Sequence, residues 1–83
     1  MFYVYVIRNT KKTLYIGTTT DLRRRLREHN EGKSKYTSEY DNWDLVYYEA
    51  YKSKIDANDR ERKLKQFGSS YGKLKKRISN SLQ

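Results

Sequence analysis

The chain has 83 residues and a formal net charge of +9, from 19 lysines and arginines against 10 aspartates and glutamates. This length predicts one small domain over residues 1–83, soluble in the cytoplasm and without a membrane span or secretion signal, with residues 79–83 frayed. With no cysteine and one histidine, the composition excludes a disulfide framework, a thiolate zinc site, a cysteine nucleophile and any multi-histidine metal site.

The first two elements read as an antiparallel hairpin. Residues 2–7 are β-branched or aromatic and apolar on both faces, which predicts a central strand. A polar turn at residues 9–12 separates this segment from a second short strand at residues 14–17. The close spacing favours antiparallel pairing of the two strands.

A helix is expected after this hairpin. Threonines at residues 18–20 supply hydroxyls that can cap it, and Asp21 adds a negative charge at its positive end. We expect the helix to run to Asn30 and to end at Gly32. Residues 33–42 are polar and predict a loop with a short helical turn.

The second half of the chain predicts one strand and two helices. Residues 44–50 form the strand, and Ser53 begins an S-x-x-D capping pattern for a helix that would end at Gly68 in a left-handed cap. Ser69 or Ser70 would cap a last helix that runs through residue 78. The sequence therefore predicts an α/β fold: a three-stranded antiparallel sheet flanked by about three helices, in the order β-β-α-β-α-α.

Charge is distributed unevenly along the chain. Residues 1–32, 33–59 and 60–83 carry net charges of +4, −2 and +7. A single basic helix would be interpreted as a solvated face, but two basic segments in one small domain favour a polyanionic partner such as nucleic acid. Neither segment has the bulky apolar face of a helix that binds a membrane surface.

Helical geometry separates the four arginines of the first helix, because each residue turns the direction by about 100°. Leu22 and Leu26 define the buried stripe, His29 lies about 20° from Leu22, and Arg25 lies about 60° from it. Arg25 and His29 therefore border the core. The solvent-facing residues are Arg23, Arg24 and Arg27.

The same arithmetic predicts an inward carboxylate in the next helix. Glu61 lies about 40° from the apolar Ala57 and beside Lys65. An inward charge is costly unless it is paired or lies in a cleft, so the simplest interpretation is a salt bridge between Glu61 and Arg25. Taken together, the carboxylate, the arginine, the histidine and nearby tyrosines fit a phosphodiester-cleaving site better.

An ordered set of short motifs covers nearly the whole chain and resembles the GIY-YIG endonuclease superfamily. The likeness is to its small stand-alone bacterial form, which is related to the N-terminal nuclease domain found in the bacterial excinuclease ABC. One departure is Tyr3, which stands where the name-giving pattern has glycine. The motifs are Tyr3-Val4-Tyr5, Tyr15-Ile16-Gly17, Thr20-Asp21-Leu22, Arg25-Leu26-x-x-His29-Asn30, Lys35-Tyr36-Thr37, Leu45-Val46-Tyr47-Tyr48-Glu49 and Ala57-x-x-Arg60-Glu61-x-x-Leu64-Lys65.

The resemblance implies metal-dependent hydrolysis of DNA, with Mg²⁺ or Mn²⁺ as cofactor and a role in DNA repair or processing. It implies that Tyr5 and Tyr15 are paired strand tyrosines and that Arg25 binds phosphate. His29 would handle or orient a proton, and Glu61 would be the sole metal-binding carboxylate. A tyrosine acting as general base would need nearby positive charge, such as that of Arg25, to favour its phenolate.

The remaining cations would contact backbone phosphates without reading sequence, so we expect weak sequence specificity and a preference for branched or nicked DNA. An adaptor that binds nucleic acid with little catalysis is the alternative function. An RNA-binding partner of the translation machinery would use the same charges. The residues expected to bind nucleic acid are Arg23, Arg24, Arg27, Lys35, Lys65, Lys73 and Lys76.

Overall fold

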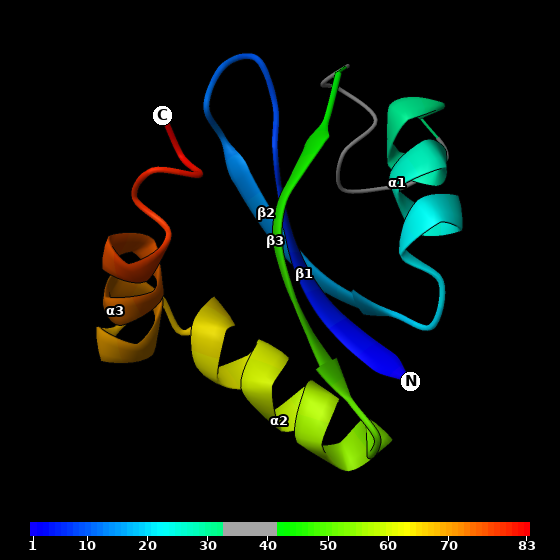
Figure 1. Ribbon diagram of the computed structural model, residues 1–83, viewed down its shortest axis with the longest axis vertical. Coiled ribbons are helices and arrows are strands. Elements are labelled where there is room, and N and C mark those ends of the chain that lie inside the picture. Colours follow the sequence, from blue (N-terminus) through cyan, green and yellow to red (C-terminus); the bar gives the residue numbers. More distant parts are fainter. Residues whose placement is uncertain (33–41) are drawn as a thin grey trace.

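Three strands form one antiparallel sheet in the order β2-β1-β3, as the sequence predicts, with β1 in the centre. The computed structural model describes residues 1–32 and 42–83 (Figure 1). The order β-β-α-β-α-α is confirmed. The elements are β1 (Phe2–Arg8), β2 (Leu14–Thr19), α1 (Leu22–Asn30), β3 (Asp44–Tyr51), α2 (Lys54–Lys65) and α3 (Ser69–Arg77).

The two faces of the sheet are covered by different helices, with α1 on one side and α2 and α3 on the other (Figure 1). Side chains alternate along β1, so Tyr5 and Ile7 point to α1 while Val4 and Val6 point to α2 and α3. The main apolar core lies under α2 and α3, where Leu64 is fully buried. The side chains on the α1 side are largely aromatic and polar, and it is there that the predicted site residues of β1 and α1 meet.

No described helix is both long and apolar enough to traverse a lipid bilayer. The longest of them, α2, has 12 residues. Most of the predicted loop, residues 33–41, lies outside the described part of the chain.

The start of α1 differs in detail from the prediction, because the capping residue is Asp21 and not one of the threonines. The Asp21 carboxylate accepts a hydrogen bond from the backbone N–H of Arg24 at 3.0 Å. The hydroxyl of Thr19 in turn accepts from the backbone N–H of Asp21 at 3.0 Å, so this threonine supports the cap. At the other end Gly32 has a φ of 73°, the left-handed conformation expected of a glycine that follows a helix.

The junction between α2 and α3 corrects two predictions. The residue in the left-handed region is Phe67, with a φ of 56°, whereas Gly68 has a φ of −97° and occupies the N-cap position of α3. Ser69 and Ser70 consequently lie inside the helix and do not cap it. The ring of Phe67 packs edge-on against Tyr71 with centroids 4.9 Å apart, a contact that helps to hold the strained backbone in place.

The C-terminal residues, expected to fray, are held against the sheet. Leu82 packs against the main core, and its backbone N–H donates to the carbonyl of Ile78 at 3.1 Å. The guanidinium of Arg8 donates to the backbone carbonyls of Leu82 and Gln83. These contacts join the end of the chain to the end of β1.

Candidate active site

Two strand tyrosines and the histidine of α1 converge on one face of the sheet. The hydroxyl of Tyr5 lies 2.8 Å from Nε2 of His29, within hydrogen-bonding distance. The ring of Tyr15 lies 6.4 Å from that of Tyr5 and 5.0 Å from that of His29, measured between centroids. Tyr5 and His29 are buried, whereas Tyr15 is partly exposed. The group is therefore open to solvent on its Tyr15 side.

Gly17 explains why a glycine must follow Tyr15 and Ile16. In the β1–β2 pairing Gly17 stands directly opposite Tyr5, so the phenol ring of Tyr5 lies over it. A Cβ atom at this position would lie 2.5 Å from the Tyr5 hydroxyl oxygen. The absence of a side chain at residue 17 is thus a condition for the Tyr5–His29 contact. Sequence reasoning used this glycine only as part of a motif.

Burial controls the protonation of the Tyr5–His29 pair. It raises the pKa of Tyr5 to about 12, and this outweighs the nearby Arg25, which acts to lower that pKa. Burial, assisted by the positive charge of Arg25, lowers the pKa of His29 to about 4. Both groups are therefore neutral at pH 7, and the expectation that Arg25 would favour a Tyr5 phenolate is wrong for the protein without substrate.

Arg25 lies beside this pair and is only partly exposed. Its guanidinium Nη1 donates to the Glu28 carboxylate at 3.0 Å, so the helix provides its ion-pair partner. Burial alone would lower the pKa of Arg25, but Glu28 and Tyr5 together raise it. Since Glu28 takes one of five N–H donors, the guanidinium retains donors for a phosphate.

Glu61 approaches the same group from α2, on the other layer. Its carboxylate pairs with Lys65 at 3.0 Å, and the Lys65 ammonium lies 5.8 Å from the centre of the Tyr15 ring. The negative charge of Glu61 also contributes to the raised pKa of Tyr5. The acid therefore lies on the Tyr15 side of the group. The simpler interpretation, a salt bridge between Glu61 and Arg25, is not what the structure shows, because each has a different partner.

The donor set around Glu61 fits a divalent ion that keeps most of its water. Among the described residues, no three or more acidic or histidine side chains gather closely enough to enclose an ion. A single carboxylate with about one fifth of its side chain exposed can offer oxygen to Mg²⁺ or Mn²⁺ while the solvent and a substrate phosphate supply the other ligands. The ammonium of Lys65 would have to give up its ion pair for this.

Two supporting residues were not identified from the sequence. Trp43 is buried just before β3, and its ring lies 6.4 Å from the rings of both Tyr15 and His29. The side chain of Asn30 holds it by donating to the Trp43 carbonyl at 3.0 Å and accepting from the Trp43 backbone N–H at 2.6 Å. The end of α1 is thus fixed to the start of β3. The one signal for this role was that Asn30 follows His29 in the motif.

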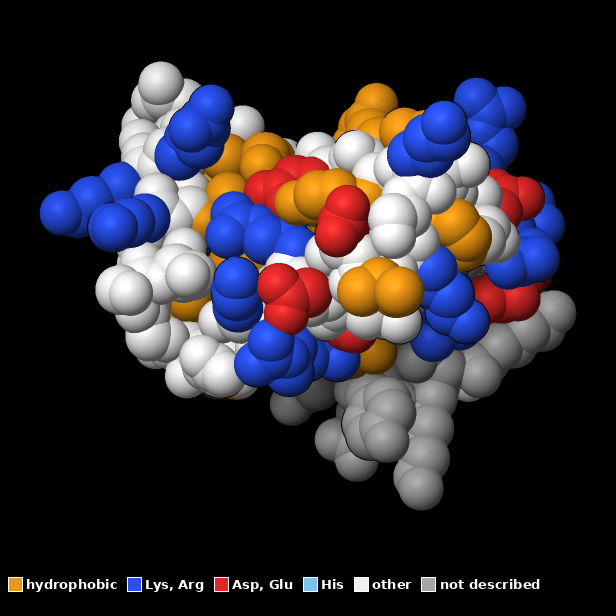
Figure 2. All heavy atoms as spheres, turned by 90° about the horizontal axis from the view of Figure 1, so that it is seen from below, with side chains coloured by type: hydrophobic (Ala, Val, Ile, Leu, Met, Phe, Trp, Pro, Cys, Tyr) orange, Lys and Arg blue, Asp and Glu red, His pale blue; other side chains and the backbone are white. Residues whose placement is uncertain are grey.

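The predicted nucleic-acid-binding residues do not lie on one surface. The three arginines of α1 are exposed on the side of the candidate site, whereas Lys73 and Lys76 are exposed on α3, across the sheet. Lys65 lies next to Glu61, and Lys35 falls outside the described residues. On the face shown in Figure 2, cationic side chains are spread widely and interspersed with acidic ones.

Comparison with known proteins gives consistent matches. The family model described as the GIY-YIG catalytic domain matches residues 1–76. A UPF0213 protein of the archaeon Haloquadratum walsbyi is 40% identical over 66 residues, which are 78% of this chain and 74% of that protein. A UPF0213 protein of Streptococcus pyogenes serotype M5 is 48% identical over 60 residues, 71% of this chain and 65% of that protein, so the chain spans less than two thirds of the streptococcal relative.

A solved structure has the same fold. The solution NMR structure of the UPF0213 protein BH0048 from Bacillus halodurans is 34% identical, with a TM-score of 0.57 over 95% of this chain and 84% of that one. The element order, the geometry around Tyr5 and the matched residues 1–76 agree. The chain belongs to the GIY-YIG family of nuclease domains and is similar to its small UPF0213 members.

Proposed function

We propose that this protein is a metal-dependent DNA endonuclease that hydrolyses phosphodiester bonds at the site formed by Tyr5, Tyr15, Arg25, His29 and Glu61. The observation that carries the proposal is the 2.8 Å contact between the Tyr5 hydroxyl and the His29 ring, with Arg25 beside it. A buried pair of this kind can move a proton without either partner carrying a charge at rest. Membership of a nuclease family supports the same conclusion.

In this mechanism the Tyr5 oxygen takes a proton from the attacking water while its own proton passes to Nε2 of His29. The new bond joins the water oxygen to phosphorus, and the bond from phosphorus to the bridging oxygen breaks. A proton relay suits the raised pKa of Tyr5, because no resting phenolate is required. Tyr15 orders the His29 ring from the solvent side by its edge-on contact.

Charge on the phosphate is met from two sides. Arg25 would exchange its contact with Glu28 for the phosphate oxygens and stabilise the negative charge that develops in the transition state. Glu61 would hold Mg²⁺ or Mn²⁺, which when bound acts as a Lewis acid on the phosphodiester. Lys65, displaced from Glu61, would remain near enough to contact the substrate backbone.

The exposed arginines of α1 support binding to backbone phosphates without sequence readout. We propose that the natural substrate is selected by its structure, as a branch, flap or nick, during DNA repair or processing in the cytoplasm. These contacts would be made by Arg23, Arg24, Arg27, Lys35 and Lys65, with Lys73 and Lys76 on the far side of the sheet.

The test is incubation of the purified protein with branched, nicked and intact supercoiled DNA, each with Mg²⁺ and with a chelator. We expect cleavage only with the metal and fastest on the branched or nicked molecules. Tight binding to all of these DNAs without cleavage under any metal condition would contradict the nuclease proposal. That result would favour the adaptor, and preferential binding of RNA would favour a partner of RNA.

A further inference from the structure

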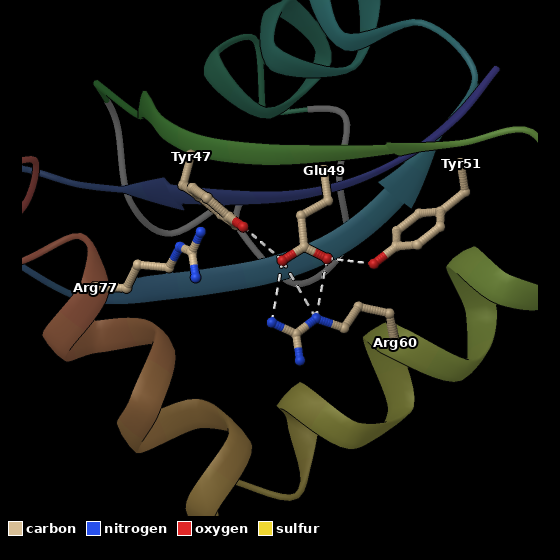
Figure 3. A pocket seen from close by; sticks show the side chains of 5 residues that line it. All are labelled: Tyr47, Glu49, Tyr51, Arg60 and Arg77. Carbon is tan, nitrogen blue, oxygen red and sulfur yellow. Dashed lines mark hydrogen bonds and ion pairs between the residues drawn. The ribbon is translucent and has the colours of Figure 1, made fainter.

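The most extensively hydrogen-bonded cluster among the described residues lies on the sheet face away from Tyr5. Glu49 of β3 accepts from Arg60 of α2 through both oxygens, at 2.9 Å to Nε and 3.0 Å to Nη2. Tyr47 donates to the same carboxylate at 2.5 Å, and Tyr51 donates to its other oxygen. Figure 3 shows all three side chains converging on Glu49. The carboxylate is therefore fully occupied and is not available to a metal.

This network ties α2 to β3 and orients Arg60. A guanidinium has five N–H donors in a rigid plane, and Glu49 engages only those on Nε and Nη2. The remaining donors of Arg60 lie at the wall of a pocket of about 400 Å³ that is also lined by Arg77. In Figure 3 the guanidinium of Arg77 reaches toward this pocket from the end of α3 without a bond to the other residues drawn.

A second hollow of about 230 Å³ shares Arg60 and Arg77 as walls and runs along α3. Its α3 residues, Ser70, Lys73, Leu74 and Arg77, follow the spacing of one helical face, with the buried Leu74 at the base. Within the described ranges, neither Lys73 nor Arg77 has a carboxylate partner. A tie between α2 and β3 accounts for Arg60 and Glu49, but it accounts for neither of these two cations.

The charges of the groove select its ligand. Arg60, Lys73 and Arg77 carry three positive charges against the one negative charge of Glu49, and Ser70 adds a hydroxyl. Planar guanidinium donors match the geometry of phosphate oxygens, which accept two parallel hydrogen bonds from one arginine. Since the positive charges exceed the negative one by two, an anion is favoured over a cation.

We propose that the groove between α2 and α3 is a second phosphate-binding site, formed by Arg60, Ser70, Lys73 and Arg77 and organised by Glu49. The phosphate would belong to a nucleic acid, because the whole chain carries a charge of +9 and exposes cations on both faces of the sheet. A free phosphate has the same chemistry, so the test separates the two sources.

The position of the groove has a consequence for the substrate. The molecule measures 28 × 26 × 20 Å, and the groove lies on the opposite side of the sheet from Tyr5 and Arg25. A nucleic acid that contacts both sites would have to bend or branch around the domain. This consequence rests on the proposed nuclease function, whereas the phosphate site itself does not.

The first experiment is an NMR titration of the full chain with inorganic phosphate, at constant ionic strength maintained with sodium chloride. We expect saturable shifts of the backbone amides of Ser70, Lys73 and Arg77. Arg77→Gln should weaken this binding by about ten-fold, the effect of losing a charge-assisted hydrogen bond. Lys75→Gln, on the same helix but outside the groove, should leave it unchanged. Absence of saturation, or equal weakening by both variants, would overturn the site.

The second experiment assigns the source of the phosphate. Both substitutions are introduced into a Glu61→Gln background, and binding of a fluorescent branched DNA is measured by anisotropy. A larger loss of affinity from Arg77→Gln than from Lys75→Gln supports a nucleic-acid phosphate. Equal losses, beside saturable inorganic phosphate, would overturn the nucleic-acid assignment. Because neither experiment measures cleavage, an inactive protein with an intact groove remains distinguishable from an active protein without this site.

Discussion

At the residue scale, the chemistry depends on two groups that burial keeps neutral. His29 is completely buried and its pKa is about 4, while Tyr5 has a pKa of about 12. His29 can therefore accept a proton during the reaction but does not carry one at rest. Helical angles identified His29 and Arg25 as inward-facing, because direction depends only on spacing. They could not predict that burial would outweigh the effect of Arg25 on Tyr5.

The pKa of His29 predicts an acid-sensitive fold. The unfolded chain protonates this histidine near pH 6.5 but the folded protein only near pH 4, so the unfolded state binds more protons between these values. The free energy of unfolding should fall with pH through this range, by up to about 3 kcal/mol for this group. Urea denaturation at several pH values measures the fall, and His29→Gln should reduce it. An NMR titration of His29 with a midpoint above pH 6 would contradict the assignment.

Arg25 and Arg24 are neighbours in sequence with different surroundings, which makes them a matched pair. Arg25 lies beside Tyr5, whereas Arg24 is exposed and only 3.9 Å from Glu28. Arg25→Ala should slow single-turnover cleavage by about 10² to 10³, the usual cost of removing a donor to a developing negative charge. Arg24→Ala should have a far smaller effect. Equal rates for the two variants would show that α1 does not direct Arg25 to the phosphate.

At the element scale, the pairing of β1 with β2 is what aligns the site. Residue 17 faces Tyr5 across the hairpin, so any side chain there would meet the phenol. The strands and their order follow from the sequence because runs of alternating or wholly apolar residues are strong local signals. The requirement at residue 17 does not, because it depends on a ring from another strand.

Gly17→Ala is predicted to displace Tyr5 and break its contact with His29. The overpacking should cost about 1 to 3 kcal/mol of stability, and cleavage should fall sharply. Gly72→Ala is the matched control, because a Cβ at Gly72 meets no atom within 4 Å and alanine favours the α3 helix by up to about 1 kcal/mol. Thermal unfolding and cleavage assays on both proteins make the comparison. A fully active Gly17→Ala protein would be inconsistent with the role of Tyr5.

The junction of α2 and α3 shows where local rules fail. Glycine is the usual left-handed residue after a helix, which is why the sequence pointed to Gly68. Phe67 adopts that conformation because its ring gains a contact with Tyr71. Tertiary packing of this kind is not encoded in the spacing of nearby residues.

At the scale of the whole molecule, the sheet separates two polar clusters. The candidate active site lies with α1, and the Glu49 network lies with α2 and α3. The charge pattern of the sequence predicted a basic protein but not this division, because Glu49, Arg60 and Arg77 meet only after three elements have packed together. Cationic side chains on both faces, not a single basic patch, are what a nucleic acid would encounter (Figure 2).

Binding to DNA should weaken steeply with salt. Each phosphate contact releases counterions, and a protein that makes about six contacts loses about 10³-fold in affinity between 50 and 200 mM salt. Anisotropy measurements with the Glu61→Gln protein, which should not cut, give the slope. An affinity that hardly changes over this range would mean that backbone phosphates are not the main contact.

The proposed nuclease chemistry depends most directly on Glu61, and one measurement tests it: single-turnover cleavage of branched DNA by Glu61→Gln beside Asp59→Asn. Both are neutralising changes on α2, but Asp59 pairs only with Arg62 and Lys63 among the described residues. We predict that Glu61→Gln abolishes Mg²⁺-dependent cleavage while binding DNA normally, and that Asp59→Asn still cuts. Cleavage by Glu61→Gln at the unmodified protein's rate would contradict the metal-binding role of this carboxylate.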